Sequence, residues 1–220
     1  MAPYRILCLH GRYQCAKTFQ SKMSLLSHLC SKLPIEFTFM NGPFVDIPPI
    51  LKKGNRFVHS VPSIRDVEDE YRGWWPGTNR DNFPYIHGTL VNYLELNDIR
   101  KFDGIIGFSQ GAALASILSS EEMSSELHWQ PKMVILFSGN LPKLIYPELY
   151  TTNFISDIST LHIYGKQDQV IPFSSANELY EAMKHDIFDC QILAHPSGHI
   201  IPVDTLSLNR IVKYIKETIN

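Results

Sequence analysis

The chain has 220 residues, a length that suits a single domain. Its apolar content of 44% and charged content of 19% are typical of a globular protein and exclude disordered, collagen-like and coiled-coil chains. The chain has 20 Lys and Arg against 22 Asp and Glu, which gives a formal net charge of −2. It therefore lacks the excess of basic residues that is typical of nucleic-acid-binding proteins. No apolar run approaches the roughly 20 residues that span a bilayer.

Cysteine usage and the N-terminal residues bear on the compartment. The four cysteines, Cys8, Cys15, Cys30 and Cys190, show no C-x-x-C spacing, which favours reduced thiols over disulfides or a metal site. The N-terminal stretch has neither the apolar segment nor the small-residue cleavage site of a secretory signal. We therefore expect a cytoplasmic protein without a bound metal.

Short apolar runs rich in β-branched residues alternate along the chain with longer segments of helical apolar spacing. Strands are predicted at residues 5–9, 36–40, 104–108, 133–137, 161–164 and 190–194. Helices are predicted at residues 17–32, 86–96, 110–119, 174–185 and 205–218. This β-α-β order predicts one α/β domain over residues 1–220, with a mostly parallel central sheet flanked by helices on both faces.

Residues 42–85 interrupt this alternation. They contain six prolines, mixed charge and an aromatic cluster of Tyr71, Trp74 and Trp75. Long irregular segments inside compact domains tend to be lids, binding loops or disordered stretches. The aromatic residues favour an ordered, lid-like insertion over disorder, because ordering them would bury a large apolar area.

The most informative stretch is G-x-S-x-G at residues 107–111, with Ser109 at its centre. It follows a predicted strand and opens a predicted helix, the context that a nucleophile elbow requires. Gly107 and Gly111 supply the small flanks that a strained serine backbone needs. The alternative is a glycine-rich connection in which Ser109 only caps the helix.

An acid and a histidine follow Ser109 in the chain order Ser, Asp, His that a catalytic triad on such a turn requires. Asp168 lies in the loop after the predicted strand 161–164, and His199 lies in the loop after the predicted strand 190–194. Both loops would emerge at the carboxyl edge of the sheet, beside Ser109. Among the other candidates, His10, His162 and His195 are expected to be structural; the rival acids are Asp157, Asp186, Asp189 and Asp204.

An oxyanion hole needs two N–H donors beside the serine. The backbone N–H of Gln110 is one candidate, and the loop after the first strand supplies the other from either Arg12 or Tyr13. An apolar wall over the nucleophile would admit an acyl chain and limit water, so Trp74 and Trp75 are candidate substrate contacts. The equal alternative is that both indoles anchor the insertion to the domain.

These residues resemble the fungal family of serine hydrolases, the FSH-type group within the α/β-hydrolase superfamily. The resemblance rests on residues 7–11 with Gln14 and on residues 102–113, 137–139, 165–168 and 195–202. It implies a Ser109–His199–Asp168 triad, carboxylesterase or thioesterase activity on acyl esters, and no cofactor. Arg12 departs from the aromatic or aliphatic residue that often stands there in the family.

Two hypotheses from other functional classes compete with the hydrolase interpretation. Residues 11–18 are one residue from the phosphate-binding pattern G-x-x-x-x-G-K-[ST], but Ala16 replaces the second glycine and no Walker-B-type aspartate ends a later strand. A catalytically silent hydrolase fold that binds a ligand or partner is the other alternative.

Overall fold

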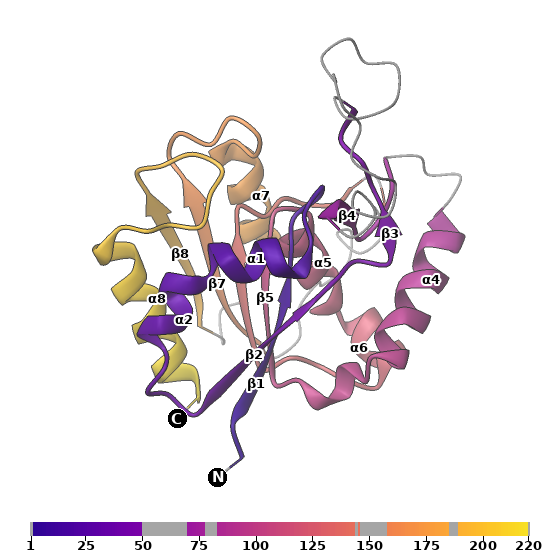
Figure 1. Ribbon diagram of the computed structural model, residues 1–220, viewed down its shortest axis with the longest axis horizontal. Coiled ribbons are helices and arrows are strands. Elements are labelled where there is room, and N and C mark those ends of the chain that lie inside the picture. The colour runs from indigo at the N-terminus through magenta and orange to yellow at the C-terminus, as the bar shows by residue number, and fades with distance from the viewer. Residues whose placement is uncertain are drawn as a thin grey trace.

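Six parallel strands form the central sheet in the computed structural model, which describes residues 2–49, 70–77, 83–143, 145, 158–184 and 189–219 (Figure 1). In order across the sheet they are β2 (Ile35–Met40), β1 (Tyr4–Leu9), β5 (Gly104–Phe108), β6 (Met133–Phe137), β7 (Ser159–Gly165) and β8 (Cys190–His195). The central strands β5 and β6 are buried at every residue, which explains their continuous apolar sequence. All six predicted strands are confirmed to within two residues.

Helices cover both faces of the sheet (Figure 1). One face carries α1 (Ala16–Lys22), α2 (Ser24–Leu29) and α8 (Thr205–Ile219). The other carries α4 (Phe83–Leu96), α5 (Gln110–Leu118), α6 (Glu121–Leu127) and α7 (Phe173–Met183). Side chains of one strand alternate between the two apolar layers, as Ile6 and Leu7 do. The predicted α/β fold class is confirmed.

Two helical segments differ from the prediction. The segment predicted as one helix over residues 17–32 forms two helices. Met23 is both the C-cap of α1 and the N-cap of α2, and its side chain is fully buried. The helix α6 was not predicted; the Ser120 hydroxyl caps it by accepting a hydrogen bond from the Met123 N–H at 3.2 Å. A short 3₁₀ helix, η3 (Ile99–Lys101), precedes β5.

The described parts of the predicted insertion lie near the carboxyl ends of the strands (Figure 1). There β3 (Phe44–Val45) pairs antiparallel with β4 (Arg72–Gly73), and Gln14 forms an isolated bridge with Arg72. A Cβ on Gly42 would lie 2.3 Å from the Gly73 carbonyl oxygen, so this approach requires glycine. Residues 70–77 are called the strap below; residues 50–69 and 78–82 lie outside the described residues.

Candidate functional site

Ser109 sits at the sharp turn between β5 and α5. Its backbone has φ 54° and ψ −116°, a conformation that costs energy in a residue other than glycine. A Cβ on Gly107 would lie 2.3 Å from the Gly111 carbonyl oxygen, and one on Gly111 would lie 2.1 Å from that of Leu9. The Ser109 side chain makes no capping hydrogen bond to α5, so its position is not explained by helix capping.

Asp168 and His199 meet at the ends of the neighbouring strands β7 and β8. The His199 Nδ1 lies 2.7 Å from Asp168 Oδ2, and the His199 ring packs on Phe108 at a centroid distance of 4.9 Å. The loops that carry the pair are joined, because the Lys166 N–H donates to the His195 carbonyl at 2.9 Å. A Cβ on Gly165 would lie 2.3 Å from the Gly198 carbonyl oxygen, so this glycine allows the two loops to approach.

The environment of Asp168 favours its charged form. Burial alone would raise the pKa of this carboxyl, but the hydrogen bonds from the Ile171 N–H and from His199 outweigh burial and lower the pKa. The Val170 and Ile171 N–H groups donate to Oδ1 at 2.9 and 2.8 Å, which leaves Oδ2 to His199. Asp168 therefore presents an ionised acceptor to one side of the imidazole.

Ser109 and His199 open into one cavity of about 520 Å³, within the usual size range of small-molecule sites. Among the described residues, no hydrogen bond joins the Ser109 hydroxyl to the His199 ring. Such contacts are often long in unliganded enzymes and tighten when substrate binds. The structure thus joins Asp168 to His199 directly, and brings His199 and Ser109 to the same cavity.

The candidate oxyanion donors line this cavity as well: Gln110, Arg12 and Tyr13. Gln110 is the first residue of α5, where a helix leaves its N–H groups free of intrahelical partners. Tyr13 has a positive φ of 60°, which turns the loop sharply after Arg12. A Cβ on Gly11 would lie 3.3 Å from that of Ser109 and 2.9 Å from the Phe108 ring, so the loop passes close to the elbow.

The Gln110 side chain fastens the strap to the elbow. Its Oε1 accepts from the Trp74 N–H, and its Nε2 donates to the Trp75 carbonyl, both at 2.9 Å. Gln110 is only 8% exposed, so the loss of these hydrogen bonds would leave buried polar groups unpaired.

His10 holds the neighbouring loop by a second set of hydrogen bonds. The Gly42 N–H donates to His10 Nε2 at 2.8 Å, so the ring proton is on Nδ1 and donates to the Gly11 carbonyl at 2.7 Å. Burial lowers the pKa of His10 to about 4, which keeps the ring neutral. The indole Nε1 of Trp74 donates to the His10 carbonyl at 2.8 Å, so strap and loop are joined directly.

The two tryptophans of the strap have different surroundings. Trp74 is fully buried, packs on His10 at a centroid distance of 5.1 Å and is absent from the cavity wall. Its position therefore fits the anchoring alternative and not the predicted substrate contact. Trp75 lines the cavity, so it remains a candidate substrate contact.

The competing sequence interpretations find less support in the geometry. The Ala16 N–H, which a phosphate loop would direct at a ligand, donates to the Asn41 side chain at 2.7 Å, and Lys17 is exposed. His162 and His195 are buried in the domain, away from the cavity wall. Among the rival acids, Asp204 accepts from the Ser207 N–H at the start of α8.

The sequence interpretation missed two residues near the site. Asp46 pairs with Arg12, and Lys143 lines the cavity after β6. Nothing local in the sequence marked Asp46 or Lys143, whereas His10 holds its loop in the structural role that was expected of it. Over the part of the chain that the structure describes, no cluster of His, Cys, Asp and Glu could hold a metal. Within the same residues, no helix has the length and apolarity to span a membrane.

The fold is that of the α/β-hydrolases. The solved structure of SOBER1 from Arabidopsis thaliana superposes with a TM-score of 0.63 at 18% identity, covering 100% of both chains. Zea mays acyl-protein thioesterase 2 gives a TM-score of 0.60 at 16% identity over 100% of this chain and 95% of that one. These likenesses establish the fold.

The sequence comparison identifies the family. The pattern described as serine hydrolase (FSH1) matches residues 1–211, and the chain belongs to this family. Esterase OVCA2 from Danio rerio is 28% identical in an alignment that covers 91% of each chain. The resemblance seen in the sequence is confirmed, and ester hydrolysis is supported as the general class of reaction.

Proposed function

We propose that the protein hydrolyses carboxylic esters or thioesters through a Ser109–His199–Asp168 triad and an acyl-enzyme intermediate. The observation that carries this proposal is the strained Ser109 turn in the cavity that also receives His199, whose ring is bound to Asp168 at 2.7 Å. No cofactor enters the proposed reaction.

In the first step the Ser109 hydroxyl oxygen attacks the carbonyl carbon, and His199 Nε2 accepts the hydroxyl proton. Asp168 binds the Nδ1–H, fixes the tautomer and stabilises the imidazolium. The tetrahedral intermediate collapses, and His199 returns the proton to the departing alkoxide or thiolate. Water then attacks the acyl-enzyme with His199 as base, which releases the acid and restores Ser109.

The negative charge on the carbonyl oxygen needs two donors during each attack. We assign one to the Gln110 N–H and the other to an N–H of Arg12 or Tyr13, which remain alternatives. Removal of one such donor typically costs on the order of 10²–10³ in kcat. The hydrogen bonds of the Gln110 side chain and of His10 support this assignment, because they hold the two donor segments against the same strap.

The test is a panel of p-nitrophenyl esters and acyl-thioesters of graded chain length, assayed with the purified protein and with Ser109→Ala. We expect turnover of at least one series and a loss of about 10³-fold or more in the variant. Ser174→Ala, on the exposed start of α7, is the matched control and should retain the activity. A fully active Ser109→Ala variant would refute the nucleophile, and no turnover in either series would favour a silent, ligand-binding hydrolase fold.

A further inference from the structure

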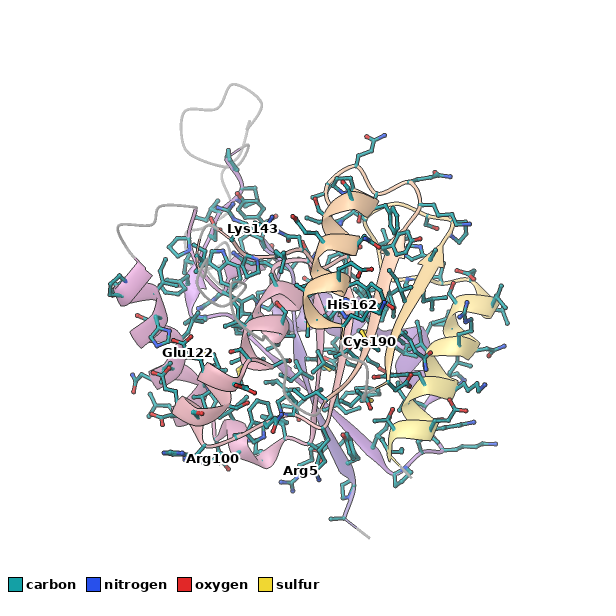
Figure 2. All side chains as sticks on the ribbon, turned by 180° about the vertical axis from the view of Figure 1, so that it is seen from behind. Arg5, Arg100, Glu122, Lys143, His162 and Cys190 are labelled. Atoms are coloured by element: carbon teal, nitrogen blue, oxygen red, sulfur yellow. The ribbon has the colours of Figure 1, made fainter. Side chains whose placement is uncertain are left out.

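The charged side chains on the cavity wall are of one sign. Among the described residues that line it, Arg12 and Lys143 are positively charged and no carboxylate contributes. They come from different loops, since Arg12 follows β1 and Lys143 follows β6. Figure 2 shows Lys143 at the carboxyl edge of the sheet, at the end opposite to Arg5. Two separate segments therefore each contribute a positively charged residue to the wall of one cavity, in a protein whose net charge is −2.

Arg12 is held in place from two sides. Its Nε donates to Asp46 Oδ2 at 2.5 Å, its second terminal nitrogen lies 3.4 Å from Oδ1, and its guanidinium carbon lies 4.6 Å from the Tyr13 ring centroid. Asp46 is 8% exposed, and its N–H donates to the Tyr71 carbonyl of the strap. A guanidinium has five N–H donors, so Asp46 leaves three for another acceptor. Because the group is already fixed, little further conformational freedom is lost when it binds an anion.

Lys143 is more adaptable. It pairs with Glu178 of α7, and both side chains are about half exposed. Ion pairs of this kind contribute little to stability, so the ammonium group can turn toward a ligand at small cost. Arg12 and Lys143 line the cavity, whereas their carboxylate partners Asp46 and Glu178 do not.

The rest of the wall favours an apolar chain, with Trp75, Phe108, Leu141, Ile145 and Val170 among its residues. An apolar wall lowers the local dielectric and strengthens charge interactions inside the cavity. We infer that the substrate is an amphipathic ester with an apolar acyl chain and an anionic group, a carboxylate, sulfonate or phosphate, bound by Arg12 and Lys143. This inference rests on the proposed ester hydrolysis and adds the substrate class.

The test compares esters of matched length that differ in charge. On the acyl side these are mono-p-nitrophenyl suberate, its neutral methyl ester, and the p-nitrophenyl ester of 8-ammonio-octanoate. On the leaving-group side they are the octanoate esters of 4-hydroxybenzenesulfonate and of neutral 4-hydroxybenzamide. Each kcat/KM is divided by the rate constant for hydroxide hydrolysis of the same ester, which removes intrinsic reactivity.

We expect an anionic ester to exceed its neutral partner by at least about tenfold in one arm, and the ammonium ester to be the slowest of its set. The arm that shows the preference identifies which side of the substrate carries the anion. Equal values for anionic and neutral esters in both arms would overturn the inference while leaving ester hydrolysis intact. Failure of every ester, with no reaction of Ser109 with a fluorophosphonate, would overturn both proposals.

Charge-removing variants assign the preference to residues. Arg12→Gln and Lys143→Gln should each reduce the anionic-to-neutral ratio, by about threefold or more, whereas Lys17→Gln on the exposed face of α1 should leave the ratio unchanged. Should Arg12→Gln fail to fold because Asp46 loses its partner, Lys143→Gln and the wild-type ratios still decide the matter. A ratio that neither pocket variant changes would contradict the assignment to these cations.

Discussion

The two halves of the site are built in different ways. Asp168 and His199 come from short loops after adjacent strands, and backbone hydrogen bonds join these loops. The proposed oxyanion half joins segments far apart in sequence, since Gln110 binds Trp74 and Trp74 binds His10. Strand order and backbone hydrogen bonds therefore bring Asp168 and His199 together, whereas the proposed oxyanion half depends on individual side-chain hydrogen bonds. Substitutions in the two halves should consequently differ in how they change kcat and stability.

The largest expected effect lies in the acid–histidine half. Asp168→Asn should lower kcat by about 10⁴-fold, because an amide neither maintains the required His199 tautomer nor stabilises the imidazolium. Steady-state kinetics and thermal melting on the same preparation measure this. Asp204→Asn is the matched control, since asparagine also caps helices and Asp204 caps α8. A folded Asp168→Asn variant within tenfold of wild type would place the essential acid elsewhere.

The next effect separates the two tryptophans of the strap. Trp74→Ala should reduce the free energy of unfolding by about 3–5 kcal/mol, because it leaves a large cavity and removes the hydrogen bond to His10. Trp75→Ala should instead change the preference for acyl-chain length, because Trp75 borders the cavity. Urea unfolding and the graded ester panel measure both quantities. An unchanged chain-length profile in Trp75→Ala would remove Trp75 from the substrate site.

The third effect concerns the junction between strap and elbow. Gln110→Met keeps the backbone N–H and the side-chain length but removes both hydrogen bonds to the strap. We expect kcat to fall by about 10²-fold with a smaller change in KM, since the oxyanion donor would lose its fixed position. Gln20→Met, on the exposed surface of α1, is the matched control. An unchanged kcat would show that the side chain has no part in positioning the donor.

The smallest effect lies beneath the acid–histidine half, on β7, the strand that precedes the loop of Asp168. Figure 2 shows His162 between β7 and α7, where its ring meets Tyr180 edge-on at 5.4 Å. Burial lowers the pKa of His162 to about 3, so the folded state keeps it neutral while the unfolded chain takes up a proton below about pH 6.5. Stability contributed by the neutral ring is thus complete above about pH 6.5 and is lost progressively toward pH 3.

Urea unfolding between pH 7 and pH 4.5 tests this pH dependence. As the pH falls, the free energy of unfolding should decrease less steeply in His162→Leu than in the wild type. The two slopes should differ by up to about 1.4 kcal/mol per pH unit. Parallel slopes for wild type and His162→Leu would mean that the histidine binds protons equally in both states.

The same contrast explains how much the sequence could predict. The strands and the order Ser109, Asp168, His199 follow from apolar runs and glycine spacing, which are local signals. The position of Trp74 did not follow, because composition does not distinguish an indole in the core from one on a cavity wall. The Arg12–Asp46 pair was also inaccessible, since it joins residues on two segments whose approach depends on tertiary packing.

The central claim is that Ser109 is the nucleophile activated by His199, and a fluorophosphonate probe tests it most directly. Labelled protein is digested, and the modified peptide is sequenced by mass spectrometry. We predict a single adduct on Ser109 in the wild type and a labelling rate lower by about 10³-fold or more in His199→Ala. An ester-hydrolysing protein that carries the adduct on another residue, or that reacts equally fast without His199, would contradict the account.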